Sequence, residues 1–219
     1  MVWRIQFDGI RRIMKPNLYE LIVEYDKLFG EKTGGILQAL DELEQLVAEI
    51  GDRKFYSMAE IGSYRGGTLW IYSQLFGNHG CKFTVVDIKI NPVLFDIKEK
   101  IQSRKNIRID LIECPSNKAK IPEIDFLHID ADHRYHMVKA DYERFSPKVV
   151  PGGIILLHDT LLDEGPGDHK SGCIRYRKEL EANGENIKTF GGTIMLCDCF
   201  GPNKSNPDNR SIGISVIYK

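Results

Sequence analysis

Residues 55–68, FYSMAEIGSYRGGT, join a short apolar strand to an acidic residue, a glycine-rich turn and the start of a helix. The apolar side chains are typical of a strand buried in an α/β sheet, and Glu60 lies where that strand should end. Gly62, Gly66 and Gly67 lack a Cβ, so the backbone can turn sharply there and pass close to a ligand. The helix that follows would present free N–H groups to polar or anionic atoms. The segment on its own is also compatible with a tight turn that binds nothing.

The composition of the chain limits the classes of protein to which it can belong. Its 219 residues are enough for one well-buried core, and 42% hydrophobic with 28% charged residues is ordinary for a soluble globular protein. A net charge of −1 gives no basic surface for nucleic acid or for an acidic membrane. No segment has the apolar length of a membrane span, and the beginning of the chain lacks the core of a signal peptide. We therefore expect neither a nucleic-acid nor a membrane partner.

The cysteines favour a reducing, cytoplasmic compartment. The five cysteines form no CxxC pair and show no regular spacing. Cys197 and Cys199 could bind a metal or oxidise, but the favoured interpretation is that they are neighbouring cysteines of one strand.

Helix and strand patterns alternate along the chain. Helices are predicted over residues 17–29, 36–50, 68–76, 92–101, 135–145 and 173–182. Further strands are predicted over residues 82–87, 107–112, 124–130, 154–158, 187–190 and 212–218. The alternation predicts a doubly wound, mainly parallel sheet between two helical layers, a three-layer α/β sandwich. Residues 1–52, which begin with a basic arm, would form an N-terminal helical cap or extension on a main domain of residues 53–219.

Acidic residues end most of the predicted parallel strands. In open α/β sheets, ligands bind beyond the carboxyl ends of the strands, where the strand order reverses. The residues at these ends, or just beyond them, are Glu60, Asp87, Asp130, Asp132, His133, His158 and Asp159. A buried carboxylate is costly unless it is paired or bound, whereas helix capping accounts for only one or two of these residues. The set therefore indicates a ligand site.

The first part of this edge suits a nucleoside. Asp87 follows Gly62 by about 25 residues, the separation at which a carboxylate can accept the hydroxyls of a ribose. A turn in which Asp87 accepts from the backbone near Lys89 is the competing interpretation. Ser116 lies past the end of the next strand, where a purine could rest.

The second part suits a cation. Asp130, Asp132 and Asp159 would converge if the strands that precede them are neighbours in the sheet. Oxygen ligands from separate strand ends suit a hard divalent cation such as Mg²⁺, which could lower the pKa of a bound substrate hydroxyl. His133 and His158 could act as general bases or as ligands of a softer metal, although His133 could equally cap the next helix.

Four stretches together resemble a known family: EIGSYRGGT, VVDIK, FLHIDADHRYHMVKADYERF and VPGGIILLHDT. They are similar to class I S-adenosylmethionine-dependent methyltransferases, and most of all to methyltransferase family 24, the small-molecule O-methyltransferase and cephalosporin-hydroxylase-like group. The resemblance covers about residues 55–162. It implies a Rossmann-like sheet of seven strands whose last strand is antiparallel. It also implies an enzyme that transfers a methyl group from S-adenosylmethionine to a hydroxyl oxygen of a small molecule.

The resemblance also implies roles for individual residues. The residues expected to bind the cofactor are Glu60, Gly62, Ser63 and Gly66 at its methionine and ribose part, Asp87 at the ribose hydroxyls, Ser116 near the adenine, and Asp130. The expected catalytic residues are Asp130, His133 and His158. In metal-dependent relatives, acids at the ends of the fourth and fifth strands hold the ion, here Asp130 and Asp159. Those relatives often have two adjacent acids at the second place, where this chain has His158 and Asp159, so the need for a metal stays open.

Two other classes of function remain. In a nicotinamide oxidoreductase, Tyr135 and Lys139 would match the Tyr-x-x-x-Lys pair of short-chain dehydrogenases, but the turn GSYRGG departs from GxGxxG. A non-catalytic binding module could keep the methyltransferase fold. Neither the acceptor nor assembly into a homo-oligomer can be decided from the sequence.

Overall fold

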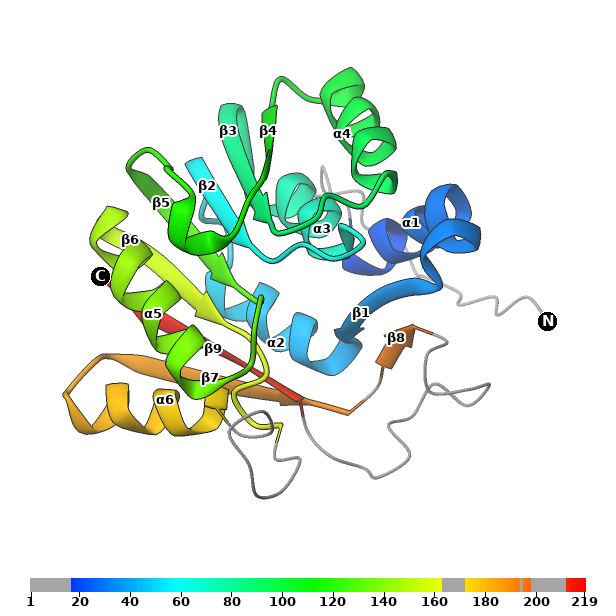
Figure 1. Ribbon diagram of the computed structural model, residues 1–219. Coiled ribbons are helices and arrows are strands. Elements are labelled where there is room, and N and C mark those ends of the chain that lie inside the picture. Colours follow the sequence, from blue (N-terminus) through cyan, green and yellow to red (C-terminus); the bar gives the residue numbers. More distant parts are fainter. Residues whose placement is uncertain (1–16, 163–171, 194, 198–211) are drawn as a thin grey trace.

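The computed structural model describes residues 17–162, 172–193, 195–197 and 212–219 (Figure 1). The helices are α1 (Leu18–Thr33), α2 (Leu40–Ile50), α3 (Gly67–Leu75), α4 (Val93–Arg104), α5 (Tyr135–Phe145) and α6 (Gly172–Ala182). The strands are β1 (Gly35–Ala39), β2 (Phe55–Ile61), β3 (Gly77–Asp87), β4 (Arg108–Glu113), β5 (Ile124–Ile129), β6 (Val149–Leu157), β7 (Ile187–Gly192), β8 (Met195–Cys197) and β9 (Ile212–Tyr218). The predicted basic arm at residues 1–16 lies outside the described residues, as do Cys199 and the side chain of Cys197.

A seven-stranded sheet confirms the predicted fold class. Its strand order is β4-β3-β2-β5-β6-β9-β7. The strands from β4 to β6 are parallel to one another, whereas β9 runs antiparallel to both β6 and β7. The chain moves from β2 outward through β3 to β4 and then returns to β5 on the other side of β2. The strand order therefore reverses between β2 and β5, and this is where a ligand site is expected.

Alternate side chains along each strand enter two separate cores. Met58 packs in the core beneath α1 to α4, whereas its neighbour Ala59 packs in the core beneath α5 and α6. The two groups of helices cover opposite faces of the sheet (Figure 1). This is the predicted three-layer arrangement.

The prediction of a helix over residues 36–50 is wrong for its first residues. α2 starts at Leu40, and the residues before it form β1, which pairs antiparallel with β8. The two-residue alternation of β1 shows in its burial, since Ile36 and Gln38 are buried and Leu37 is exposed. The helical spacing of the apolar residues continued through this stretch by coincidence, and the pairing with a segment far along the chain decides its conformation.

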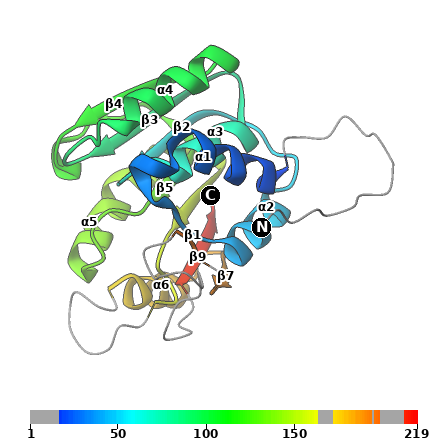
Figure 2. The same cartoon turned by 90° about the vertical axis from the view of Figure 1, so that its right-hand side faces the viewer.

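The N-terminal elements belong to the same core as the first strand. α1 begins with a capping box between Asn17 and Glu20, which satisfies two N–H groups at the start of the helix. Figure 2 shows α1 against α3, and buried residues of both helices share a core with those of α2 and β2. The elements preceding β2 therefore cover one face of the sheet near the strand ends. No helix among the described residues is long and apolar enough to cross a membrane.

Candidate functional site

A tight glycine turn joins β2 to α3 at the point where the strand order reverses. Gly62 has a φ of +84°, and a methyl group on its Cα would lie 2.2 Å from the carbonyl oxygen of Asp130. The backbone N–H of Asp130 donates to the carbonyl of Ile61 at 2.9 Å. The absence of a side chain at Gly62 therefore lets the ends of β2 and β5 approach each other closely.

A cavity of about 960 Å³ opens beside this turn. The predicted site residues on its wall are Gly62, Asp87, Ser116, Asp130, Asp132 and His133. Asp141, which the sequence analysis did not select, also lines it although only 3% of its surface is exposed. Burial raises the pKa of Asp141, and a hydrogen bond from Ser116 partly opposes that rise. We call Gly62, Asp87 and Ser116 the cavity half of the site.

Asp87 links the end of β3 to the glycine turn. Its Oδ2 accepts from the N–H groups of Ser63 and Tyr64 at 2.9 and 3.2 Å, and its Oδ1 accepts from the N–H of Lys89 at 3.1 Å. The turn through Lys89 is therefore formed, yet Asp87 still faces the cavity. Because a carboxylate has about four lone-pair positions, one remains at Oδ1 for a ligand donor.

Glu60, Ser63 and Gly66 were predicted to bind the cofactor but are not on the cavity wall. Glu60 is fully buried; its Oε1 accepts from Thr68 and lies 3.0 Å from His128 Nδ1, while its Oε2 has no hydrogen-bond partner. Gly66, with a φ of +77°, caps the beginning of α3. His128 was missed, although it lies two residues before Asp130 in the predicted strand over residues 124–130, a spacing that puts both side chains on one face.

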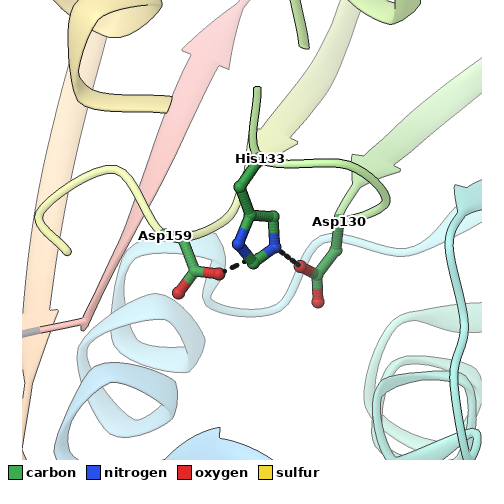
Figure 3. Close-up of side chains that lie close together, drawn as sticks. All are labelled: Asp130, His133 and Asp159. Atoms are coloured by element: carbon green, nitrogen blue, oxygen red, sulfur yellow. Dashed lines mark ion pairs between the residues drawn. The ribbon is translucent and has the colours of Figure 1, made fainter. Parts of the chain in front are cut away.

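Four residues at the ends of β5 and β6 form what we call the acid cluster: Asp130, His133, His158 and Asp159. Nε2 of His133 lies 3.0 Å from Asp159 Oδ2 and 3.7 Å from Asp130 Oδ1 (Figure 3). Asp159 has a φ of +53°, a conformation that costs energy for any residue other than glycine and is common at functional sites. Two parallel strands and the loop after β5 thus direct these groups toward one point.

Charge within the acid cluster shifts the pKa values of its members. Hydrogen bonds with Asp130 and Asp159 raise the pKa of His133 to about 10. Burial alone would raise the pKa of Asp130, but His158, His133 and His128 outweigh it and hold that pKa well below its usual range. Asp130 and His133 therefore stabilise each other in their charged forms.

Asp130, His133 and Asp159 could hold a metal ion. One ligand atom from each lies within 4.8 Å of the others. The structure does not bring the predicted ligand Asp132 into this group, because its carboxylate pairs with the Arg134 guanidinium, and its Oδ1 also accepts from the Arg134 N–H at 3.0 Å. The geometry thus replaces a third carboxylate with an imidazole.

His158 is held on both sides rather than open to a substrate. Its Nδ1 lies 3.2 Å from Asp130 Oδ1, and its Nε2 lies 3.2 Å from Glu42 Oε1. Only 6% of its surface is exposed. The predicted role of His158 as a catalytic base does not suit this geometry, because neither ring nitrogen is left for a substrate proton. Glu42 was not selected from the sequence, where it lies on the predicted helix with no motif around it.

Two comparisons with known sequences give matches to parts of the chain. Residues 59–160 match a family described as "Methyltransferase domain". An uncharacterised protein of Sinorhizobium fredii is 44% identical over 59 residues, which are 27% of this chain and 6% of that protein. The chain thus spans a small part of the length of that relative.

Solved structures share the fold. An O-methyltransferase from Bacillus cereus in complex with S-adenosylhomocysteine is 15% identical, with 92% of this chain and 90% of that chain covered and a TM-score of 0.61. An O-methyltransferase of tomaymycin synthesis from Streptomyces achromogenes, in complex with S-adenosylmethionine, is 11% identical, with 92% and 89% covered and a TM-score of 0.59. At these identities the likeness establishes a common fold.

Proposed function

We propose that this chain transfers a methyl group from S-adenosylmethionine to a hydroxyl oxygen of a small molecule. The match of residues 59–160 to a family described as "Methyltransferase domain" supports the proposal. The observation that carries the proposal is the cavity at the reversal of strand order, with Asp87 and Asp130 on its wall. Its size lies within the range of about 300–1,000 Å³ that is usual for cofactor and ligand sites.

The residues of the cavity half fit the cofactor. The remaining lone-pair position at Asp87 Oδ1 can accept a ribose hydroxyl, and Ser116 with buried Asp141 offers polar atoms to an adenine edge. Gly62 lets a ligand approach the backbone closely. These residues would bind and orient the adenosyl part, and positioning of this kind can supply about 7–11 kcal/mol of a barrier in favourable cases.

The acid cluster fits a divalent cation. Asp130 and Asp159 would supply oxygen ligands and His133 a nitrogen ligand, a donor set that suits Mn²⁺ or Zn²⁺ as well as Mg²⁺. When bound, such a cation lowers the pKa of an acceptor hydroxyl. Asp130 lies both on the cavity wall and in this cluster, so the acceptor oxygen would be held next to the methyl donor.

A cofactor-binding assay and a transfer assay test the proposal. S-adenosylhomocysteine should raise the melting temperature of the protein, and Asp87→Ala should abolish most of that rise, because a hydrogen bond to a charged group is worth about 1.5–3 kcal/mol. An equal rise in the variant would refute the role of Asp87. Transfer of a labelled methyl group to a metabolite extract, with and without EDTA, should occur and should fall when the cation is removed. Binding of the cofactor without any transfer would instead favour a non-catalytic binding module.

The positions of Tyr135 and Lys139 do not support a nicotinamide oxidoreductase. Tyr135 and Lys139 both pair with Glu179 on α6, and neither lies on the cavity wall. Their spacing reflects packing between α5 and α6.

A further inference from the structure

Two side chains from the elements before β2 reach the acid cluster from its buried side. Glu42, in the first turn of α2, is fully buried, and Gln38, in β1, is 2% exposed. We propose that Glu42 is a positioning residue that holds His158, so that His158 in turn fixes the carboxylate of Asp130 for a divalent cation. The proposal rests on the cation-assisted form of the proposed function.

An unbroken series of polar contacts supports this role. Glu42 Oε1 lies 3.2 Å from His158 Nε2, and His158 Nδ1 lies 3.2 Å from Asp130 Oδ1. Each ring nitrogen of His158 therefore lies within hydrogen-bond distance of a carboxyl oxygen. The Nε2 of Gln38 approaches the other oxygen of Asp130 at 3.5 Å. His158 and Gln38 thus contact the two carboxylate oxygens of Asp130 from the buried side of the cluster, while Asp130 still lines the cavity.

Packing and helix capping do not account for Glu42. A carboxylate can be favourable near a helix N-terminus, and both Asp41 and Glu42 lie in the first turn of α2, but this effect does not require a carboxylate to be buried. Asp41 accepts from the N–H of Thr193 at 2.9 and 3.0 Å. Glu42 instead points inward, and its Oε2 is buried without a hydrogen-bond partner. Because an unpaired buried carboxylate oxygen is costly, an apolar residue would serve packing better at this place.

The expected effect follows from how metal ligands are oriented. Groups that hydrogen-bond to the ligands, without touching the ion, commonly contribute 10- to 100-fold to metal affinity. Glu42 acts through His158 and is one step further away, so we expect a loss near the lower limit, about 10-fold. Its removal should leave the cavity half unchanged, since Glu42 does not line the cavity.

The test measures Mn²⁺ affinity of the whole chain by calorimetry or electron paramagnetic resonance. Glu42→Met keeps the length of the side chain without a strong acceptor and should weaken Mn²⁺ binding by about 10-fold. Glu42→Gln keeps an acceptor oxygen for the His158 N–H and should restore the affinity to within about 3-fold of the unchanged protein. Glu49→Met is the matched control on the same helix, because Glu49 pairs with Lys188 and Tyr218, away from the acid cluster.

Several results would overturn the proposal. The first is an Mn²⁺ affinity that is unchanged in Glu42→Met. The others are a loss of Mn²⁺ affinity in Glu42→Gln, or in Glu49→Met, as large as the loss in Glu42→Met. If Glu42→Met shows no cooperative melting, Glu42→Ala replaces it, and its Mn²⁺ affinity is compared with that of Glu42→Gln. Absence of Mn²⁺ binding by the unchanged protein would also overturn it. The methyltransferase proposal would then be judged separately by the melting shift with S-adenosylhomocysteine and by methyl transfer.

Discussion

The two halves of the strand-end edge are built in different ways. In the cavity half, the carboxylate of Asp87 accepts from backbone N–H groups of the glycine turn and of Lys89, two residues further along the chain. In the acid cluster, the side chains that follow β5 and β6 are held by one another and by side chains from β1 and α2. A site fixed by local backbone tolerates change elsewhere, whereas a site fixed by distant side chains depends on the whole fold.

The largest effect is expected where the two halves meet. Gly62→Ala should lower the free energy of unfolding by about 2–5 kcal/mol, from about 1–2 for the left-handed backbone and 1–3 for overpacking against Asp130. Both cofactor binding and cation binding should fall together. Chemical denaturation measures the free energy of unfolding, and calorimetry measures the binding of the cofactor and of the cation. Gly80→Ala is the control, because Gly80 has a φ of +82° with nothing within 4 Å of an added methyl group. Equal losses in the two variants would show that the halves are not joined through Gly62.

A smaller effect should separate the two halves. His133→Ala should weaken Mn²⁺ binding by at least about 10-fold, because it removes a ligand atom. Asp132→Ala should change that affinity by less than about 3-fold, because Arg134 holds the Asp132 carboxylate away from the group. The melting shift with S-adenosylhomocysteine should persist in both variants. If Asp132→Ala weakened Mn²⁺ binding more than His133→Ala did, Asp132 rather than His133 would be the third ligand.

The smallest effect concerns Asp141 in the wall of the cavity. Since burial raises the pKa of this carboxyl in the folded protein, its ionisation opposes folding. The stability it contributes is present below its unfolded pKa near 3.8 and is lost as the pH rises through the folded value. Asp141→Asn should therefore gain in stability over the unchanged protein as the pH rises toward neutrality. Denaturant unfolding at several pH values measures this, and a constant difference would contradict it.

The features that could be predicted from the sequence differ between the two halves in the same way. The alternating patterns and the glycine turn were sufficient for the parallel part of the sheet and for the cavity edge, because each depends on residues close in the chain. The antiparallel last strand was implied by the family resemblance alone. β1 was missed because its partner β8 lies far along the chain and has only three residues. Glu42 and Gln38 were missed for a related reason, since no local spacing connects them with Asp130.

The same dependence on distant partners appears in β9, which lies between β6 and β7. During synthesis, β7 leaves the ribosome before the strand that must separate it from β6. Ribosomes add about 5–20 residues each second, so β7 waits roughly 1–5 s without a partner in the sheet. Until β9 is made, the nascent chain also exposes an unpaired strand edge on β6, which could pair with another chain.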